Sequence, residues 1–111
     1  MKRVLSFLSI ISLLFVISCG EEENLKEYVV VLKNHNFNPA VLSVNSGEKF
    51  KLIIDNQDAT AEEFESHDLK REKIIKGNTK SVVFIGKLTA GEYKYFGEFN
   101  EDEAQGKIVV N

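Results

Sequence analysis

The stretch that decides the fold is residues 91–110, GEYKYFGEFNEDEAQGKIVV. Its first part alternates, because Tyr93 and Tyr95 fall on one face of an extended chain while charged residues fall on the other. A polar loop without a positive charge follows at residues 98–103, and the stretch ends with the β-branched run KIVV at residues 107–110. The pattern predicts a strand, a loop and a second strand.

The rest of the chain carries further short apolar runs that are separated by turn signals. The expected strands are residues 28–32, 40–44, 48–55, 73–75 and 79–85. In the third of these, Phe50, Leu52 and Ile54 alternate with mostly charged neighbours, which is typical of a half-buried strand. Residues 35–39, HNFNP, are expected to form a turn-rich crossing. Short strands at this spacing, with turns between them, predict an all-β sandwich.

Composition limits the class of protein. A chain of 111 residues suffices for one domain, and 43% apolar residues support a folded core. A single Cys excludes an internal disulfide. The net charge of −3, without a basic stripe, excludes a generic nucleic-acid partner.

The N-terminus has the pattern of an export signal. Lys2 and Arg3 precede an apolar run that is too short for a stop-transfer helix, and the run ends in VISC at Cys19. This ending resembles a bacterial lipobox, in which the Cys becomes the lipidated N-terminus. An ordinary secretory signal with an incidental Cys is the alternative.

These features divide the chain into three parts. Residues 1–18 are expected to be a lipoprotein signal peptide, residues 19–27 the lipidated Cys and an acidic linker, and residues 28–111 the domain. The predicted location is the periplasmic side of the cell envelope, where the N-terminal lipid holds the protein to a membrane. In lipoproteins similar to this one, the absence of Asp after the Cys favours the outer membrane.

The decisive stretch resembles the C-terminal ligand loop of the cupredoxins, the blue-copper, plastocyanin-like family. In that family a G-x-Y-x-Y strand leads to a Cys, a His and usually a Met. Here Gly97 stands in place of the Cys, Asn100 stands in place of the His, and no Met precedes Gly106. Glu62 ends an N-x-D-x-x-x-E segment at the place of the first His ligand. The resemblance implies a cupredoxin-like Greek-key β-sandwich, whereas a type 1 copper site is rejected because it needs a thiolate and two imidazoles.

Further residues resemble one branch of that family. The strings EEFES at residues 62–66 and REK at residues 71–73 are similar to the EfeO-type cupredoxin-like domain. That domain occurs in periplasmic components of bacterial iron-uptake systems and in stand-alone lipid-anchored proteins. The resemblance covers residues 28–110, although the family usually carries a His where this chain has Asn100. It implies binding of a transition-metal ion, iron or copper(II), as a carrier or accessory to metal uptake, with an uptake-system or envelope protein as partner.

A second resemblance concerns the approach to the last strands. Residues 88–93, LTAGEY, are similar to the tyrosine corner of Greek-key sandwiches, in which a Tyr hydroxyl pins the connection to the sheet.

Carboxylates are the metal-binding groups that this chain offers. The expected metal ligands are Glu62, Glu63, Glu65 and Glu98, followed by His35 and Glu101. In a cupredoxin-like sandwich their loops meet at one end, where carboxylates repel one another unless a cation or proton offsets the charge. Oxygen ligands suit hard ions, and a histidine would shift the preference toward iron, copper(II) or zinc.

Plainer interpretations stay open beside this one. Acidic loops are usually solvated surface, Arg71 or Lys73 could neutralise the carboxylates, and His67 is expected on the surface. On a strand, Glu63 and Glu65 face one side and Glu62 the other, so these three cannot all bind one ion.

The alternative function is a metal-free β-sandwich that mediates protein–protein contacts at the cell envelope. The sequence has no nucleophile–base pair, phosphate loop or zinc spacing, and this predicts a protein that is not an enzyme.

Overall fold

The computed structural model describes residues 24–111, which form nine strands and one short 3-10 helix. The strands are β1 (Lys26–Lys33), β2 (Asn36–Asn38), β3 (Val41–Val44), β4 (Phe50–Asn56), β5 (Glu62–Ser66), β6 (Arg71–Ile75), β7 (Thr79–Ile85), β8 (Gly91–Gly97) and β9 (Gln105–Val110), and the helix is η1 (Glu98–Asn100). No helix among these residues is long and apolar enough to span a bilayer. The expected signal peptide and Cys19 lie outside the described residues, so both stay predictions.

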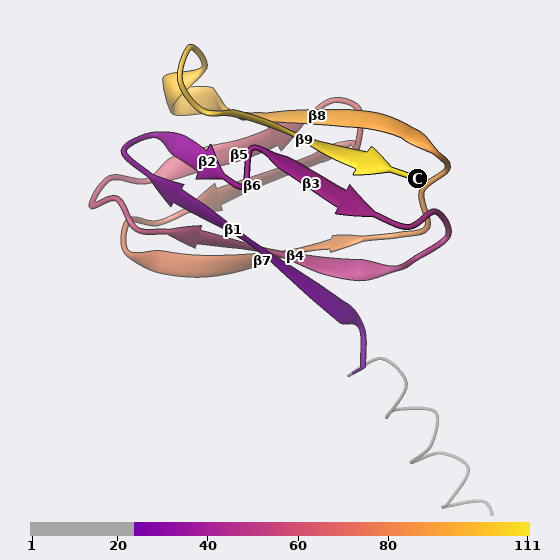
Figure 1. Ribbon diagram of the computed structural model, residues 1–111. Coiled ribbons are helices and arrows are strands. Elements are labelled where there is room, and N and C mark those ends of the chain that lie inside the picture. The colour runs from indigo at the N-terminus through magenta and orange to yellow at the C-terminus, as the bar shows by residue number, and fades with distance from the viewer. Residues whose placement is uncertain (1–23) are drawn as a thin grey trace, which may run out of the picture.

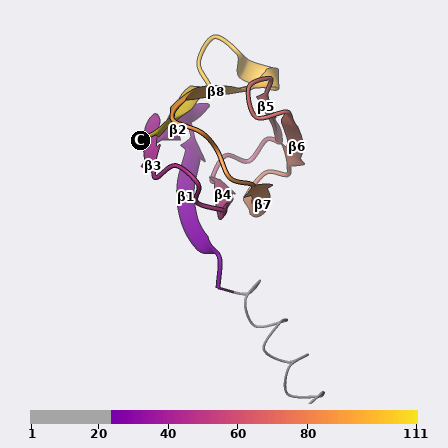
Figure 2. The same ribbon diagram turned by 90° about the vertical axis from the view of Figure 1, so that its right-hand side faces the viewer.

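Two sheets face each other, as Figure 1 shows from the side and Figure 2 after a quarter turn. One sheet has the order β2-β1-β4-β7, and the other has the order β3-β9-β8-β5-β6. The pairs β1–β4 and β3–β9 are parallel, and the remaining pairs are antiparallel. The expected all-β sandwich is confirmed.

The core forms where the inward faces of the two sheets meet. Strand β4 alternates buried and half-buried residues along its whole length, as its sequence predicts. Near the middle of the core the Tyr95 ring packs against Phe37 and Phe64, with ring centroids 5.1 Å and 5.0 Å away. This aromatic cluster joins β8 and β5 of one sheet to β2 of the other.

The tyrosine corner is present at the start of β8. The Tyr93 hydroxyl donates a hydrogen bond to the backbone carbonyl of Thr89 over 2.9 Å. This bond holds the connection between β7 and β8, which lie in different sheets, and it confirms the expectation from LTAGEY.

Three strands differ most from the expectations, and one of them, β5 at residues 62–66, was not among the expected strands. Residues 36–38 were expected in a turn, but they form β2, which pairs antiparallel with β1. The reason is a tight turn in which Asn34 and His35 have positive φ and donate their N–H groups to Asp58 over 2.7 Å and 3.0 Å. Strand β6 starts at Arg71 rather than at residue 73, because Ser66 and Arg71 pair across the β5–β6 hairpin.

Three connections meet at one end of the sandwich, which we call the loop pole. They are the turn at residues 34–35, the loop at residues 57–61 and the loop at residues 98–104. Asp58 hydrogen-bonds the first connection, and Glu62, at the end of the second, accepts a bond from the third. His35 therefore lies at the same end as residues 56–63, as the sequence predicts.

Candidate metal site

Glu62 begins β5 and points into the sandwich, where only 2% of its surface is exposed. Its Oε1 accepts hydrogen bonds from the backbone N–H groups of Glu63 (2.9 Å) and Phe99 (2.8 Å). Its Oε2 accepts a bond from Asn100 Nδ2 over 2.8 Å. A buried carboxylate is tolerated when donors replace the lost water, and these three N–H groups supply that replacement.

Gly97 leaves the space that the Glu62 carboxylate fills. A Cβ atom added at Gly97 would lie 2.6 Å from Glu62 Cδ and 2.7 Å from the Cβ of Ala104. The backbone of Gly97 has a φ of −93°, which any residue adopts, so the site requires glycine for space and not for conformation. The three positions that the sequence resemblance matches to cupredoxin ligands, Glu62, Gly97 and Asn100, therefore form one packed group.

This group does not fit a type 1 copper ion. Such an ion requires a thiolate and imidazoles, and the group offers a carboxylate, a bare backbone and an amide. Both carboxylate oxygens already accept hydrogen bonds, and the space beside Gly97 is filled. We therefore derive no chemistry through copper at this position.

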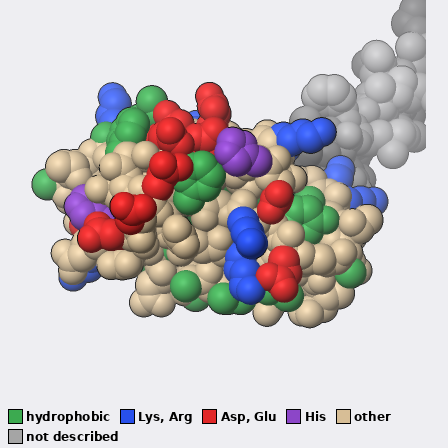
Figure 3. Space-filling model, turned by 90° about the horizontal axis from the view of Figure 1, so that it is seen from above, with side chains coloured by type: hydrophobic (Ala, Val, Ile, Leu, Met, Phe, Trp, Pro, Cys, Tyr) green, Lys and Arg blue, Asp and Glu red, His purple; other side chains and the backbone are tan. Residues whose placement is uncertain are grey.

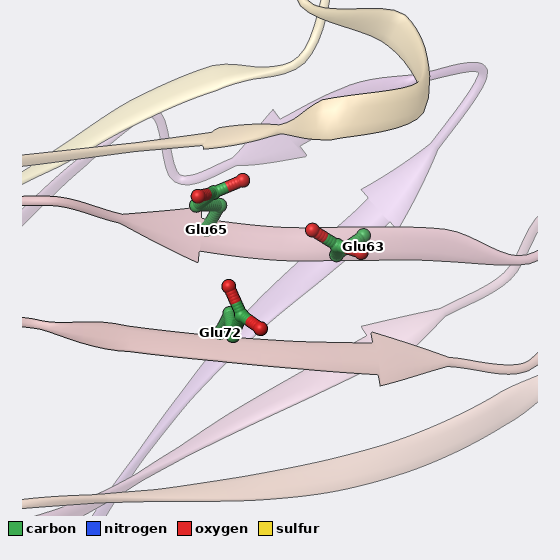
Figure 4. Close-up of side chains that lie close together, drawn as sticks. All are labelled: Glu63, Glu65 and Glu72. Atoms are coloured by element: carbon green, nitrogen blue, oxygen red, sulfur yellow. The ribbon is translucent and has the colours of Figure 1, made fainter.

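The outer face of the same strand carries a second set of carboxylates. Glu63 and Glu65 point away from the core and are half-buried, and Glu72 lies on β6 as the register partner of Glu65. One oxygen from each of these three side chains lies within 4.8 Å of the others. Figure 4 shows the three carboxylates on the same side of the two adjacent strands.

Glu98 joins this outer set from the loop at residues 98–104. The pKa of Glu65 is raised, first by its hydrogen bond with the Glu98 side chain, then by burial, and then by the negative charges of Glu98 and Glu63. The structure thus brings together Glu63, Glu65 and Glu98, as predicted, and adds Glu72. We call these four residues the outer cluster.

Within residues 24–111 no Lys or Arg forms an ion pair with the outer cluster, and the basic side chain that acts on it is His67, whose electrostatic influence lowers the pKa of Glu65 against the other causes. The ion pairs in this part of the chain involve other carboxylates, namely Glu27, Glu48, Asp58 and Glu92. Arg71, which the sequence offered as a neutralising partner, donates to the backbone carbonyl oxygens of Phe84, Leu69 and Lys70. The negative charges of the cluster thus face one another and solvent.

The remaining expected ligands lie outside the outer cluster. Glu62 points to the opposite face of β5, as the alternation of a strand predicts. His35 Nδ1 lies 3.6 Å from Asp58 Oδ2 and pairs with that carboxylate. Glu101 is exposed in the loop at residues 98–104. His67 is nearer to the cluster, since it shares a shallow hollow with Glu65 and Glu72.

Glu72 was not among the ligands expected from the sequence. The signal that could have revealed it is the hairpin register, since Glu65 and Glu72 are equally distant from the turn at residues 67–70. Because β6 was expected to start at residue 73, Glu72 was not placed opposite Glu65.

Figure 3 looks down on the five-stranded sheet and shows acidic side chains in a band across one part of that face, with histidines beside it.

Comparisons with known proteins agree with this architecture. The family model of the cupredoxin-like domain matches residues 6–110. The uncharacterized protein RP394 of Rickettsia prowazekii is 44% identical over 89 residues, which cover 80% of this chain and 71% of that protein.

Two solved structures share the fold. The metal binding domain of the Cu(I) exporting P-type ATPase CopA of Streptococcus pneumoniae D39 has a TM-score of 0.68 at 10% identity, covering 77% of this chain and 84% of that chain. The "blue" copper protein auracyanin A of Chloroflexus aurantiacus has a TM-score of 0.68 at 17% identity, covering 79% of this chain and 100% of that chain. At such identities the likeness shows the fold alone.

Proposed function

Because the chain belongs to the cupredoxin-like domain family, we propose that it binds a transition-metal ion, iron or copper(II), through carboxylates on its surface. The observation that carries this proposal is the convergence of Glu63, Glu65 and Glu72, with Glu98 beside Glu65. In this proposal the protein is a carrier or an accessory to metal uptake, and it performs neither blue-copper electron transfer nor catalysis.

The spacing of the oxygens suits a metal ion. Two oxygen ligands on opposite sides of an ion, each at about 2.0 to 2.5 Å from it, are separated by about 4 to 5 Å. The oxygens of Glu63, Glu65 and Glu72 lie within 4.8 Å of one another, so one ion could contact all three after small side-chain rotations. An all-oxygen set favours a harder ion over Cu(I), which prefers soft sulfur ligands.

The electrostatics of the outer cluster also favour a bound cation. Four carboxylates in close proximity repel one another, and this repulsion adds to the hydrogen bond with Glu98 and to burial, the two larger causes that raise the pKa of Glu65. A divalent or trivalent cation would relieve the repulsion. Two structural neighbours are a metal binding domain with Cu(I) and a "blue" copper protein, which keeps copper beside iron among the candidate ions.

The proposed location is the periplasmic side of the cell envelope, and the N-terminal sequence supports it. Cys19 would carry the lipid, and residues 20–25 would separate the membrane from β1. The proposed branch is the EfeO type, in which a stand-alone domain would pass its ion to an uptake-system or envelope protein.

The test is calorimetric titration of residues 20–111, which contain both sheets and the whole described core, with ferric, ferrous and copper(II) ions. The double variant Glu65→Gln/Glu72→Gln should lose at least tenfold in affinity. The variant Asp102→Asn/Glu103→Gln removes the same charge from an exposed part of the neighbouring loop and should bind nearly as the parent does. Equal, weak binding by all three proteins would end the proposal.

A specific observation favours the alternative of a metal-free contact module. On the outer face of the four-stranded sheet Val29, Ile53 and Val82 lie side by side in register, and Phe84 is 59% exposed nearby. Such an apolar row could contact an envelope protein. Elemental analysis of protein purified from the periplasm separates the two functions, since stoichiometric metal supports the first and its absence supports the second.

A further inference from the structure

We infer that Glu62 is an internal clamp, whose carboxylate joins β5 to the loop at residues 98–104. The carboxylate links two segments that are remote in sequence, as a metal ion does in other proteins. This inference concerns the inner face of β5 and does not depend on whether the outer cluster binds metal.

The hydrogen bonds of Glu62 have the pattern of a link between segments. Phe99 N–H and Asn100 Nδ2 belong to residues 37 and 38 positions further along the chain, and they contact different oxygens of the same carboxylate. A bound metal ion joins distant segments in the same way, by taking ligands from each of them. Here a side chain of the protein supplies the link.

The surrounding loop is closed around this contact. Gly97 N–H donates to the carbonyl of Ala104, and Ala104 N–H donates to the carbonyl of Asn100, each over 2.8 Å. Ala104 is fully buried, and no Cβ fits at Gly97. The space beside Gly97 is therefore filled by the Glu62 carboxylate, which reaches it from β5.

Charge makes the clamp specific for a carboxylate. All three partners of Glu62 are N–H donors, so an ionised carboxylate accepts every bond without offering a donor in return. A leucine would fill much of the same volume but would leave the N–H groups of Glu63 and Phe99 without an acceptor. Buried donors in that condition destabilise a fold.

The experiment compares Glu62→Leu and Glu62→Ala with the parent, using residues 20–111 in the presence of a chelator. Chemical unfolding should show that Glu62→Leu lowers the folding equilibrium constant at least tenfold. The smaller Glu62→Ala vacates the carboxylate space, so added formate should raise its unfolding midpoint more than chloride does at equal ionic strength. Glu62→Leu, in which the leucine occupies that space, should not respond to formate. Glu103→Gln, an exposed change in the same loop, serves as the control.

A milder variant keeps the test decisive if Glu62→Ala does not fold. Asn100→Ala removes one donor from the clamp and should accelerate amide hydrogen exchange at Phe99 and Ala104, while Val83 in β7 stays protected. The clamp is overturned if Glu62→Leu is as stable as the parent, or if exchange at Phe99 is unchanged in Asn100→Ala. A crystal structure grown with copper(II), in which Glu62 leaves Asn100 to ligate the ion, would overturn it as well.

Discussion

Glu65 on β5 and Glu72 on β6 are directly opposite each other in an antiparallel pair, and their carboxylates lie on the same side of the sheet. Like charges at opposed positions destabilise a sheet. Glu63 and Glu98 add two more negative charges beside them. A bound cation would offset this repulsion. The metal-free protein should therefore be less stable than a variant in which one of these carboxylates is neutral.

Replacing Glu65 by Gln should therefore stabilise the metal-free protein at neutral pH. The pKa of Glu65 is raised in the folded state, chiefly by the hydrogen bond with Glu98. A raised pKa means that the folded state prefers the protonated acid, so the stability that this group contributes is complete below the unfolded pKa and is lost as pH rises through the folded pKa. Chemical unfolding of both proteins from about pH 4 to about pH 7 should show this decline in the parent and a weaker one in Glu65→Gln.

Glu92 provides a control of opposite sign for that experiment. Its pKa is lowered, first by the hydrogen bond from Lys107 and then by the Lys107 charge. The stability that it contributes is present above the unfolded pKa and is lost as pH falls through the folded pKa. Glu92→Gln should therefore lower stability at neutral pH, and a gain there would contradict the argument for both residues.

Metal should stabilise the folded protein through the outer cluster. A ligand at 100 times its dissociation constant that binds only the folded state adds about 2.7 kcal/mol. Thermal unfolding with ferric or copper(II) ions should therefore show a rise in Tm for the parent. Glu65→Gln/Glu72→Gln should lose that rise, and Asp102→Asn/Glu103→Gln should keep it.

Much of the fold could be predicted because its signals are local. Alternation along residues 50–56 and 91–97 assigns the inward faces. The resemblance of LTAGEY to a tyrosine corner predicts a Tyr hydroxyl that pins this connection, and the structure contains it as the bond from Tyr93 to Thr89. Strand β2 could not be predicted, because the turn before it depends on Asp58, which lies more than twenty residues away.

The candidate site could be predicted in part, because some of its signals are also local in the sequence. Alternation places Glu63 and Glu65 on one face, and the meeting of the loops places Glu98 beside them. Glu72 depends on a hairpin register that short apolar patterns do not specify. The bonds of Glu62 depend on the path of the loop backbone at Phe99, which residue types alone do not reveal.

Asn56 should be among the most sensitive polar positions of the fold. Its side chain is fully buried, and Nδ2 donates to the carbonyl oxygens of Thr60 (3.0 Å) and Ile75 (3.2 Å). Its Oδ1 accepts the N–H of Asp58 over 3.0 Å, so the side chain joins the end of β4 to the following loop and to β6. Asn56→Ala should cost about 3 kcal/mol in the free energy of unfolding, because buried groups lose their partners. The exposed Asn36→Ala should cost far less, and similar losses for the two would show that the buried network adds little.

Tyr95 should limit stability at alkaline pH. Its hydroxyl is buried and is without a hydrogen-bond partner among the described residues, and burial raises its pKa to about 12. The unfolded pKa is about 10, so the stability linked to the neutral phenol is complete below that pH and is lost as pH rises through about 12. Tyr95→Phe removes an unsatisfied hydroxyl and should add about 1 kcal/mol at neutral pH, and more above about pH 10. Tyr93→Phe, which breaks the bond to Thr89, should instead lower stability at neutral pH. Unfolding curves for the three proteins at neutral and alkaline pH check both signs, and a Tyr95→Phe protein that is less stable than the parent would show that the hydroxyl has a partner after all.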